Sequence, residues 1–339
     1  MSQRRSQESG SLGRTVCLAS LSANGSIGSL NKERWSERLI TASRKRIYLE
    51  WTKGYLFILP SIIGFSVFVA YPLISSLYYA LTDWDGINKP KFVGLDNFIY
   101  MFTVDPAFWK SLRVTFYYVL LNVPASLIFG LALAMLLNRK LPGIKFFRTA
   151  FYLPTVIPAV ATLTLWRYMY QPQYGLANQV LRLFGLPDAP WLTSENTALL
   201  SIILSGLWQV GSGMIIFLSG LQSVPQDLYE AAEVDGAKGW TTFSRVTLPM
   251  ITPILFLQLI LGIIGSFQAF TQIVVLTHGG PNFSTMLLNY KIYGDVFNGK
   301  MFGYGIAEVW ILFLIIMFFT LLTYRYSNRF VHYENDNRG

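Results

Sequence analysis

The chain has 339 residues, of which 53% are hydrophobic and only 13% are charged, and its formal net charge is +9. Soluble domains usually carry about a quarter charged residues, so this composition excludes an ordinary soluble protein. A single cysteine excludes an internal disulfide, and two histidines argue against zinc or haem sites, which mostly use His or Cys ligands.

Residues 1–53 are rich in Ser, Gly and basic side chains, and they lack the long apolar core of a signal peptide. We interpret them as a solvated, basic cytoplasmic tail whose positive charge helps to fix orientation in a membrane. A short cytoplasmic tail is also expected over residues 331–339. The region between them, residues 54–330, is predicted to be a single membrane domain.

Six hydrophobic segments follow the N-terminal tail, each close to the ~20 residues that a bilayer requires. They run over residues 55–77, 114–137, 147–168, 199–221, 253–276 and 304–324. Trp84-Asp85-Gly86 is a turn signal after the first segment. The predicted fold is therefore all-α, a polytopic membrane protein with six transmembrane helices.

The distribution of basic residues predicts the orientation. The loop between the second and third segments carries Arg139, Lys140, Lys145 and Arg148 and no acidic residue. In the loops on the opposite side, acidic residues dilute the basic ones. The positive-inside rule therefore predicts that both termini are cytoplasmic, as is the loop between the fourth and fifth segments.

That loop, residues 223–250, is the one long polar interruption in the hydrophobic second half. Ser223 and Gln226 have the spacing of a capping box, which predicts a short helix beginning there. Gly236 and Gly239 permit a left-handed stop and a sharp turn at its end.

Leu228, Ala231 and Ala232 share one face of this short helix because they are three or four residues apart. Two alanines leave that face flat, so another protein can approach it closely. We therefore expect the helix to lie at the membrane surface and to be presented to a soluble partner.

The loop over residues 223–250 resembles the EAA loop of bacterial ABC importer permeases, and we call it the coupling loop. The residues that carry the resemblance are Glu230-Ala231-Ala232, Asp235-Gly236-Ala237, Val246-Thr247-Leu248-Pro249 and Pro253. In that family the loop docks into the ATPase subunit. The resemblance implies that Glu230, Ala231, Ala232, Asp235 and Gly236 couple this chain to an ATPase. Gly236 would supply the turn, the alanines a close-contact face, and Glu230 a charge for a basic partner.

Further motifs over residues 54–330 narrow the resemblance to carbohydrate-uptake permeases, of the first-permease type in maltose and sn-glycerol-3-phosphate systems. They are Leu136-Leu137-Asn138-Arg139, the run from Phe147 to Pro154, and Leu276-Thr277-His278-Gly279-Gly280-Pro281 with Ser284-Thr285. Gly279, Gly280 and Pro281 form the outer-loop signature of that family. On their own they are also consistent with a sharp turn that ends a membrane helix.

Neutral hydrogen-bonding side chains are concentrated in two of the hydrophobic segments. The candidates for the substrate pathway are Trp208, Gln209, Gly211 and Ser212 in the fourth segment, Ser266, Gln268, Thr271 and Gln272 in the fifth, and Asn122 in the second. Amides, hydroxyls and aromatic faces suit a sugar, although small and polar residues also join membrane helices to one another. Maltose-type members carry asparagines near residues 266–269, so the sugar need not be maltose.

Glu308 is the one carboxylate predicted inside a membrane segment, close to its outer end, and it departs from the family pattern. A charge at the bilayer centre costs about 2.5–3.5 kcal/mol on insertion scales. We expect Glu308 to reach the headgroups or to pair with a neighbouring helix. A role as a gate at the outer mouth is the alternative.

The resemblance implies an ABC sugar-importer permease in a bacterial inner membrane. Its implied partners are a second homologous permease, a dimeric ATPase that binds ATP and Mg, an extracytoplasmic sugar-binding protein and membrane lipid. The sequence lacks a G-x-x-x-x-G-K-[ST] phosphate cradle and a Ser/His/Asp arrangement, so we expect no catalytic residues, no cofactor of its own, no metal site and no nucleic-acid partner.

Three alternatives remain. A phosphorylated polyol as substrate would require Lys or Arg near the membrane midplane. A stand-alone secondary transporter would predict an inverted repeat and a titratable group inside the membrane. A membrane-embedded enzyme would require a catalytic cluster.

Overall fold

The computed structural model describes residues 51–139 and 141–330, so the predicted tails lie outside the described residues except for residues 51–53. The chain divides into two units, residues 1–74 and 75–339. In the first unit, the described residues form a helix. This helix spans Trp51–Ala80 in all, contains a π-helical turn η1 (Ser66–Ala70) and ends with α3 (Tyr71–Ala80), so the first predicted membrane segment is confirmed as a helix but is longer than expected.

The second unit opens with a small hairpin. Strands β1 (Thr82–Asp83) and β2 (Lys91–Phe92) pair antiparallel, with Thr82 opposite Phe92. Between them, the carboxylate of Asp85 accepts the N–H groups of Ile87 and Asn88 at 3.0 and 2.8 Å. The predicted turn at Trp84-Asp85-Gly86 is therefore confirmed.

Four helices in the described residues are long and apolar enough to cross a membrane: Trp51–Ala80, Pro106–Leu137, Gly239–Phe267 and Phe302–Tyr326. The second of these is α5 (Pro106–Leu137), and the last belongs to α16 (Phe302–Phe330). The third comprises α12 (Gly239–Thr242), the π-helical η2 (Phe243–Thr247) and α13 (Leu248–Phe267). Two bent helix pairs bring the count to six if each pair is one span, as the sequence predicts.

The third predicted span is bent rather than straight. It consists of α6 (Ile144–Val156) and α7 (Ala159–Met169), which meet at an angle of 99°. Pro158 is the cause, because proline disfavours the helical conformation of the residue before it, and Ile157 is extended with a ψ of 136°.

The fourth predicted span is bent as well. Helices α9 (Glu195–Leu207) and α10 (Gly211–Ser223) meet at 53° around the turn at residues 208–210. Gly211 begins α10 where the backbone of α6 passes very close, so that an added Cβ would overlap the carbonyl oxygen of Phe151. Only glycine allows this approach of two backbones.

The fifth predicted span, residues 253–276, is divided too, because α13 ends at Phe267 and α14 (Thr271–Leu276) follows a three-residue break. The remaining elements are short. They are α4 (Asp96–Thr103), α8 (Leu176–Leu183), α11 (Gln226–Val234), α15 (Leu288–Tyr293) and the π-helical η3 (Gly294–Asn298).

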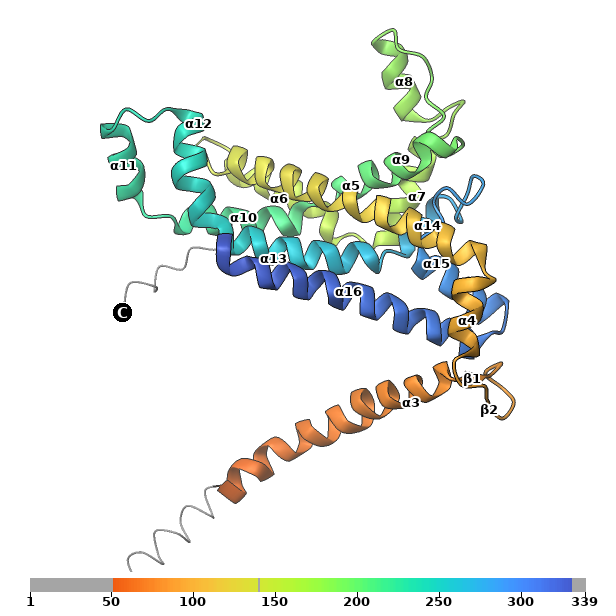
Figure 1. The fold of residues 1–339 in the computed structure, drawn as a ribbon. Coiled ribbons are helices and arrows are strands. Elements are labelled where there is room, and N and C mark those ends of the chain that lie inside the picture. Colours follow the sequence, from red (N-terminus) through yellow and green to blue (C-terminus); the bar gives the residue numbers. More distant parts are fainter. Residues whose placement is uncertain (1–50, 140, 331–339) are drawn as a thin grey trace, which may run out of the picture. The chain divides into compact units, whose positions relative to one another are not determined.

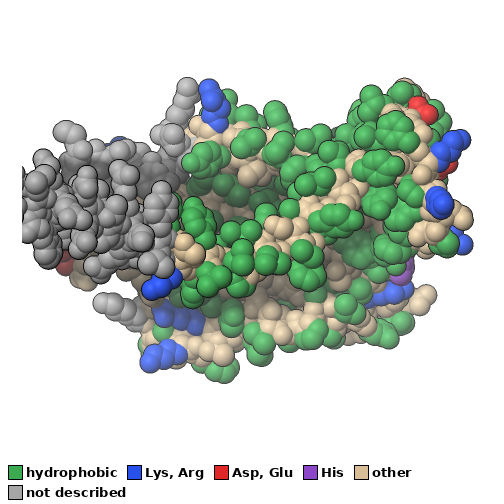
Figure 2. Space-filling view, turned by 90° about the horizontal axis from the view of Figure 1, so that it is seen from below, with side chains coloured by type: hydrophobic (Ala, Val, Ile, Leu, Met, Phe, Trp, Pro, Cys, Tyr) green, Lys and Arg blue, Asp and Glu red, His purple; other side chains and the backbone are tan. Residues whose placement is uncertain are grey.

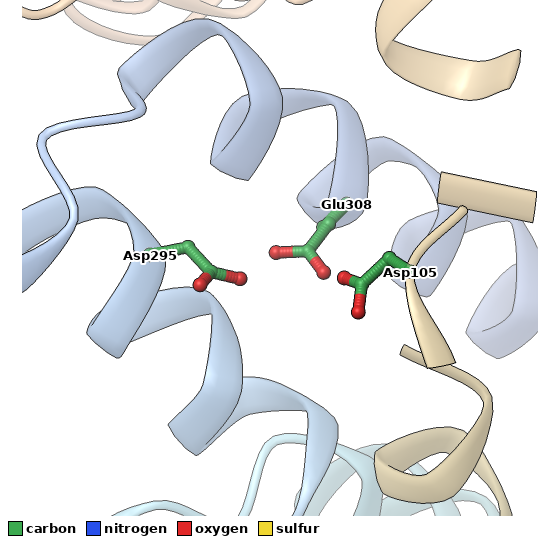
Figure 3. A group of neighbouring side chains, drawn as sticks. All are labelled: Asp105, Asp295 and Glu308. Carbon is green, nitrogen blue, oxygen red and sulfur yellow. The ribbon is translucent and has the colours of Figure 1, made fainter. Parts of the chain in front are cut away.

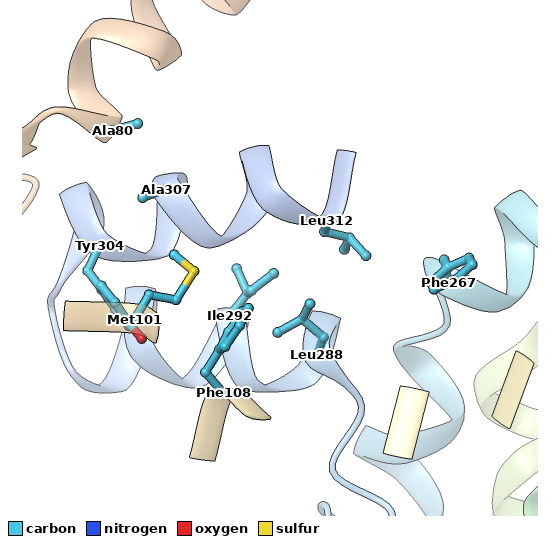
Figure 4. Packing of buried hydrophobic residues seen from close by; sticks show 9 residues of the cluster. All are labelled: Ala80, Met101, Phe108, Phe267, Leu288, Ile292, Tyr304, Ala307 and Leu312. Carbon is cyan, nitrogen blue, oxygen red and sulfur yellow. The ribbon is translucent and has the colours of Figure 1, made fainter. Parts of the chain in front are cut away.

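Within the second unit, α5 packs along α10 and α13, and α13 packs along α16. Figure 4 shows one of the resulting hydrophobic clusters, which extends from Tyr304 at one end, past Phe108 and Leu288, to Leu312 and Phe267 at the other. On the face drawn in Figure 2, hydrophobic side chains cover the middle, and Lys and Arg gather toward the two ends. This distribution suits a protein surrounded by lipid.

The short elements gather at opposite ends of these long helices (Figure 1). Helices α11 and α12 lie at one end, and α4, α8, α15 and the β-hairpin lie at the other. The coupling loop and the loop with the Gly-Gly-Pro signature are therefore separated by the length of the membrane helices.

The close approach at Gly211 generates a testable prediction. Replacing Gly211 with Ala should lower the free energy of unfolding by about 1–3 kcal/mol, because a backbone cannot move aside as a flexible side chain can. The matched control is Gly265→Ala in α13, where an added Cβ meets nothing within 4 Å and where alanine favours the helix by roughly 0.5–1 kcal/mol. Thermal unfolding in mild detergent measures the stability of both variants. Equal unfolding midpoints for the two would contradict the close approach of α10 and α6 described here.

Candidate functional site

The start of α11 differs from the prediction. Ser223 does not cap the helix, because its hydroxyl donates to the carbonyl of Gly220 at 2.9 Å within the preceding helix. Gln226 instead donates through Nε2 to the carboxylate of Glu230 at 3.0 Å. The predicted capping box is therefore wrong, since Ser223 still belongs to α10 and bonds back to its own last turn.

The end of α11 confirms the predicted turn at Gly236. This residue has a φ of +75°, and its N–H donates to Glu233 at 3.0 Å. The N–H of Ala237 donates to Ala232 at 2.9 Å, which satisfies a second carbonyl of the last turn. Gly239 is not a left-handed stop, because it begins α12 instead.

The two alanines of the motif do not share one open surface, which corrects the prediction of a flat face. Ala231 is exposed, whereas Ala232 is only 9% exposed and is buried within the chain itself. The hydroxyl groups of Tyr229 and Thr247 lie 3.2 Å apart and tie this inner side of α11 to η2. A partner would therefore meet Glu230, Ala231 and the 88% exposed Val234.

Both predicted clusters of substrate-pathway residues fall at helix interruptions. Trp208 and Gln209 lie in the turn between α9 and α10, and Gln268 lies in the break between α13 and α14. Thr271 and Gln272 form the first turn of α14 and are half-buried. Interruptions leave backbone N–H and C=O groups outside the helical ladder, which membrane proteins tolerate where protein or a water-filled cavity surrounds them.

The structure brings Asn122 and Ser266 together. The amide of Asn122 on α5 donates to the hydroxyl of Ser266 on α13 at 2.9 Å, and Ser266 is buried. This pair therefore joins two helices. The described residues contain no hydrogen bond, ion pair or ring contact that links the cluster at residues 208–212 to the cluster at residues 266–272.

The remaining candidates of the fourth span have different surroundings. Gly211 is buried against α6, whereas Ser212 is exposed. Trp208 is 56% exposed and meets the ring of Trp166 edge to face. Both tryptophans line a cavity of about 510 Å³ whose wall is apolar and is completed by residues such as Phe147.

The loop over residues 277–287 (the outer loop) is held by its own hydroxyl groups. Thr277 and Thr285 lie with their hydroxyl oxygens 2.8 Å apart, and Thr285 also donates to the carbonyl of Gly280 at 2.7 Å. Gly279 has a φ of +81°, and an added Cβ would lie 3.0 Å from the ring of Tyr290. The glycine is therefore required by both conformation and space, and Pro281 continues the turn.

Two further contacts tie the outer loop to the start of α5 and α9. Lys110 donates to the carbonyl of Asn282 at 2.7 Å and lies over the ring of Phe283. The amide of Asn282 donates to Glu195 at 3.0 Å. The signature is thus part of a surface built by three segments at the end opposite the coupling loop.

A charged cluster that the sequence analysis missed lies beside the outer loop. The ammonium of Lys291 lies 2.7 Å from Asp105, 2.6 Å from Asp295 and 2.7 Å from Glu308. We call these four residues the Lys291 cluster, and Figure 3 shows its three carboxylates converging. Glu308 is completely buried, so its predicted pairing with a neighbouring helix is confirmed and the prediction that it reaches the headgroups is wrong.

The ammonium of Lys291 and the carboxyl groups around it shift one another's pKa. Burial opposes the charge on Asp105, but hydrogen bonds from Lys291 and Tyr304 outweigh it and lower the pKa of Asp105. Burial also disfavours the charge on Lys291, but the carboxylates around it raise the pKa of the ammonium. The three carboxylate oxygens lie within 4.8 Å of one another, a spacing that would also suit a metal ion. Here Lys291 supplies the positive charge between them.

Local sequence offers only weak signals for this cluster. Lys291 and Asp295 have the i, i+4 spacing of a helical ion pair. Asp105 precedes a proline, a pattern typical of a helix start, and its carboxylate accepts the N–H groups of Ala107 and Phe108. No local sequence pattern connects these residues to Glu308.

Comparison with known proteins agrees with this architecture. Residues 126–332 match the family described as binding-protein-dependent transport system inner membrane component. A probable ABC transporter permease, YesP of Bacillus subtilis, is 40% identical over 286 residues, covering 83% of this chain and 92% of that protein. The trehalose/maltose permease MalF of Thermococcus litoralis is 34% identical over 282 residues, covering 81% and 93%.

A solved structure shows the same fold. A chain of a bacterial alginate ABC transporter, crystallised in complex with an alginate pentasaccharide-bound periplasmic protein, matches with a TM-score of 0.74 and 25% identity. The match covers 84% of this chain and 96% of that chain. The chain described here therefore belongs to the family of binding-protein-dependent transport system inner membrane components and is a multi-pass permease subunit of an ABC importer.

Proposed function

We propose that this permease forms half of the pathway by which a neutral sugar crosses the cytoplasmic membrane. The observation that carries the proposal is the coincidence of two helix interruptions with neutral polar side chains, around Gln209 and Gln268. A sugar needs hydrogen-bonding groups that have no partner in the protein. The backbone N–H groups of Gln209 and Gln268 are bonded, but their side-chain amides have no hydrogen-bond partner among the described residues. The trehalose/maltose and alginate transporters among its relatives support a carbohydrate as substrate.

A phosphorylated polyol is a weaker candidate because it would need an available positive charge inside the membrane. Lys291 is buried, but three carboxylates already surround its ammonium. Arg167 donates to the carbonyl of Val275 at 3.4 Å and is exposed. The neutral sugar therefore remains the proposal.

The orientation follows from charge. We infer that both termini and the coupling loop face the cytoplasm, and that the outer loop faces the opposite side. The basic, acid-free loop before α6 supports this assignment. So does the position of α11 and α15 at opposite ends of the long helices.

The remaining subunits complete the proposed transporter. A second homologous permease would form the other half of the pathway, and a dimeric ATPase that binds ATP and Mg would dock on α11. An extracytoplasmic sugar-binding protein would deliver the substrate at the outer loop. In this arrangement the permease changes access from one side to the other and catalyses no reaction itself. It is expected to need lipid and to bind no nucleic acid.

The direct test is purification of the tagged permease from gently solubilised membranes of its own cells. An ATPase, a second permease and a sugar-binding protein should co-purify, and the reconstituted complex should take up the sugar that the binding protein retains. Uptake by the permease alone, without ATP, would instead support a secondary transporter.

Mutation of Gln209, which lies in a helix interruption, and of Asn122, which joins two helices, should give different phenotypes. Gln209→Ala should raise the KM for sugar uptake by up to about tenfold, the value of one hydrogen bond, without changing thermal stability. Asn122→Ala should instead lower the free energy of unfolding by about 1 kcal/mol, because it leaves the buried Ser266 without its partner. Uptake kinetics and thermal unfolding on the same preparations distinguish the two roles, and a raised KM in Asn122→Ala alone would reverse the assignment.

The turn that ends α11 predicts a coupling defect. Gly236→Val should reduce sugar uptake by at least about tenfold, because a β-branched residue does not adopt the φ of +75° found there. Assembly with the ATPase is measured in parallel on the purified complex. The matched control is Gly239→Val, whose position has no positive φ and no atom within 4 Å of an added Cβ. Normal uptake by Gly236→Val would refute a requirement for this turn.

A further inference from the structure

The Lys291 cluster joins three segments that are distant in the sequence. Asp105 precedes α5, Lys291 lies on α15, and Glu308 lies on α16. The hydroxyl of Tyr304 donates to Asp105 at 2.6 Å, and the ammonium of Lys291 lies 5.1 Å from the centre of the Tyr304 ring. One lysine side chain therefore holds the outer ends of α5 and α16 against α15.

Helix α15 also connects this cluster to both parts of the proposed transport machinery. It begins directly after the outer loop, and the N–H of Leu288 donates to the buried hydroxyl of Thr115 on α5 at 2.8 Å. The amide of Asn289 donates to the carbonyl of Gln268 at 2.9 Å, in the break of the fifth span. A shift of the outer loop would therefore reach Gln268 and the cluster through the same short helix.

The cluster is not the arrangement that stability alone would favour. It sets one ammonium against three carboxyl groups, and burial of such groups usually costs more than an apolar core would. One oxygen of Glu308, Oε2, is buried without a hydrogen-bond partner among the described residues. The oxygens of the three carboxyl groups lie within 4.8 Å of one another, and the ammonium of Lys291 between them offsets their mutual repulsion, so the cluster depends on the position of Lys291.

We propose that Lys291 is a positioning residue for the outer loop, and that its contact with Glu308 sets this loop in the geometry to which the binding protein docks. This inference rests on the proposed function. Asp105 and Asp295 anchor the ammonium to the ends of α5 and η3, and Glu308 is the contact that reaches the membrane-spanning part of α16. Loosening that contact should weaken docking more than it weakens the fold.

The principal variant is Glu308→Gln, which keeps the shape of the side chain and leaves Lys291 paired with Asp105 and Asp295. The complete complex of both permeases and the ATPase is reconstituted in lipid nanodiscs, and its ATPase rate is measured while sugar-loaded binding protein is titrated. We expect the half-saturating concentration of binding protein to rise by about fivefold or more, the lower end of typical coupling between sites. The rate without binding protein and the unfolding temperature should change little.

The matched control is Asp96→Asn, which removes an exposed carboxylate on α4 at the same end of the molecule. It should leave the half-saturating concentration unchanged. A Glu308→Gln complex that unfolds at a lower temperature but docks normally would show a merely structural role and would overturn the inference. Normal docking at normal stability would overturn it equally.

A second variant tests the ammonium itself. Lys291→Ala leaves the space between three carboxylates without its cation, and added methylammonium can occupy that space and donate hydrogen bonds. Methylammonium should restore docking at least in part, whereas tetramethylammonium, which has no N–H to donate, should not. Equal effects of the two cations would contradict a positioning role.

The wild-type complex separates the two hypotheses. If no binding protein stimulates its ATPase rate, the proposed function is refuted. If the wild type is stimulated and the variants are unaffected, only this inference is refuted.

Discussion

The structure depends on one constraint, which is that every backbone N–H and C=O group within a bilayer must find a partner inside the protein. Long helices satisfy the constraint automatically, and the chain departs from them at residues 157–158, 208–210 and 268–270. A proline accounts for the first departure. The other two carry amide and aromatic side chains, so the places where the helical ladder is open are also the places with hydrogen-bonding capacity for a sugar.

The same helices connect these openings to the coupling loop. Helix α10 runs from the turn after Trp208 directly to the loop, and α13 returns from the loop to the break at Gln268. The two helices pack against each other and against α5. A displacement of α11 would therefore reach both interruptions through two rigid, mutually packed elements, which would give the proposed ATPase a direct physical route to the proposed substrate pathway.

At the opposite end, charged contacts add to the hydrophobic cluster that includes Phe108, Leu288 and Tyr304. The outer loop is joined to α5 and α9 by Lys110 and Asn282, and α15 is joined to α5 and α16 by the Lys291 cluster. Ion pairs of this kind depend on geometry much more steeply than apolar contacts do. They favour one arrangement of these helix ends over alternatives with similar buried area, which would suit docking of the proposed binding protein.

Sequence by itself determined the membrane class, the helical fold, the Gly236 turn and both clusters of polar residues, because hydropathy, glycine conformation and side-chain type are local properties. Pro158 is a local signal for the bend at Ile157, but hydropathy alone does not show it, and no local pattern locates the division of the fifth span, since a 20-residue apolar segment has the same composition whether it is straight or broken. It placed Ala231 and Ala232 on one face, but packing against η2 buries only Ala232. The role of Asn122 as a partner of Ser266, and the convergence of Asp105, Lys291, Asp295 and Glu308, were decided by tertiary structure alone, because they join residues up to 203 positions apart that no local pattern relates.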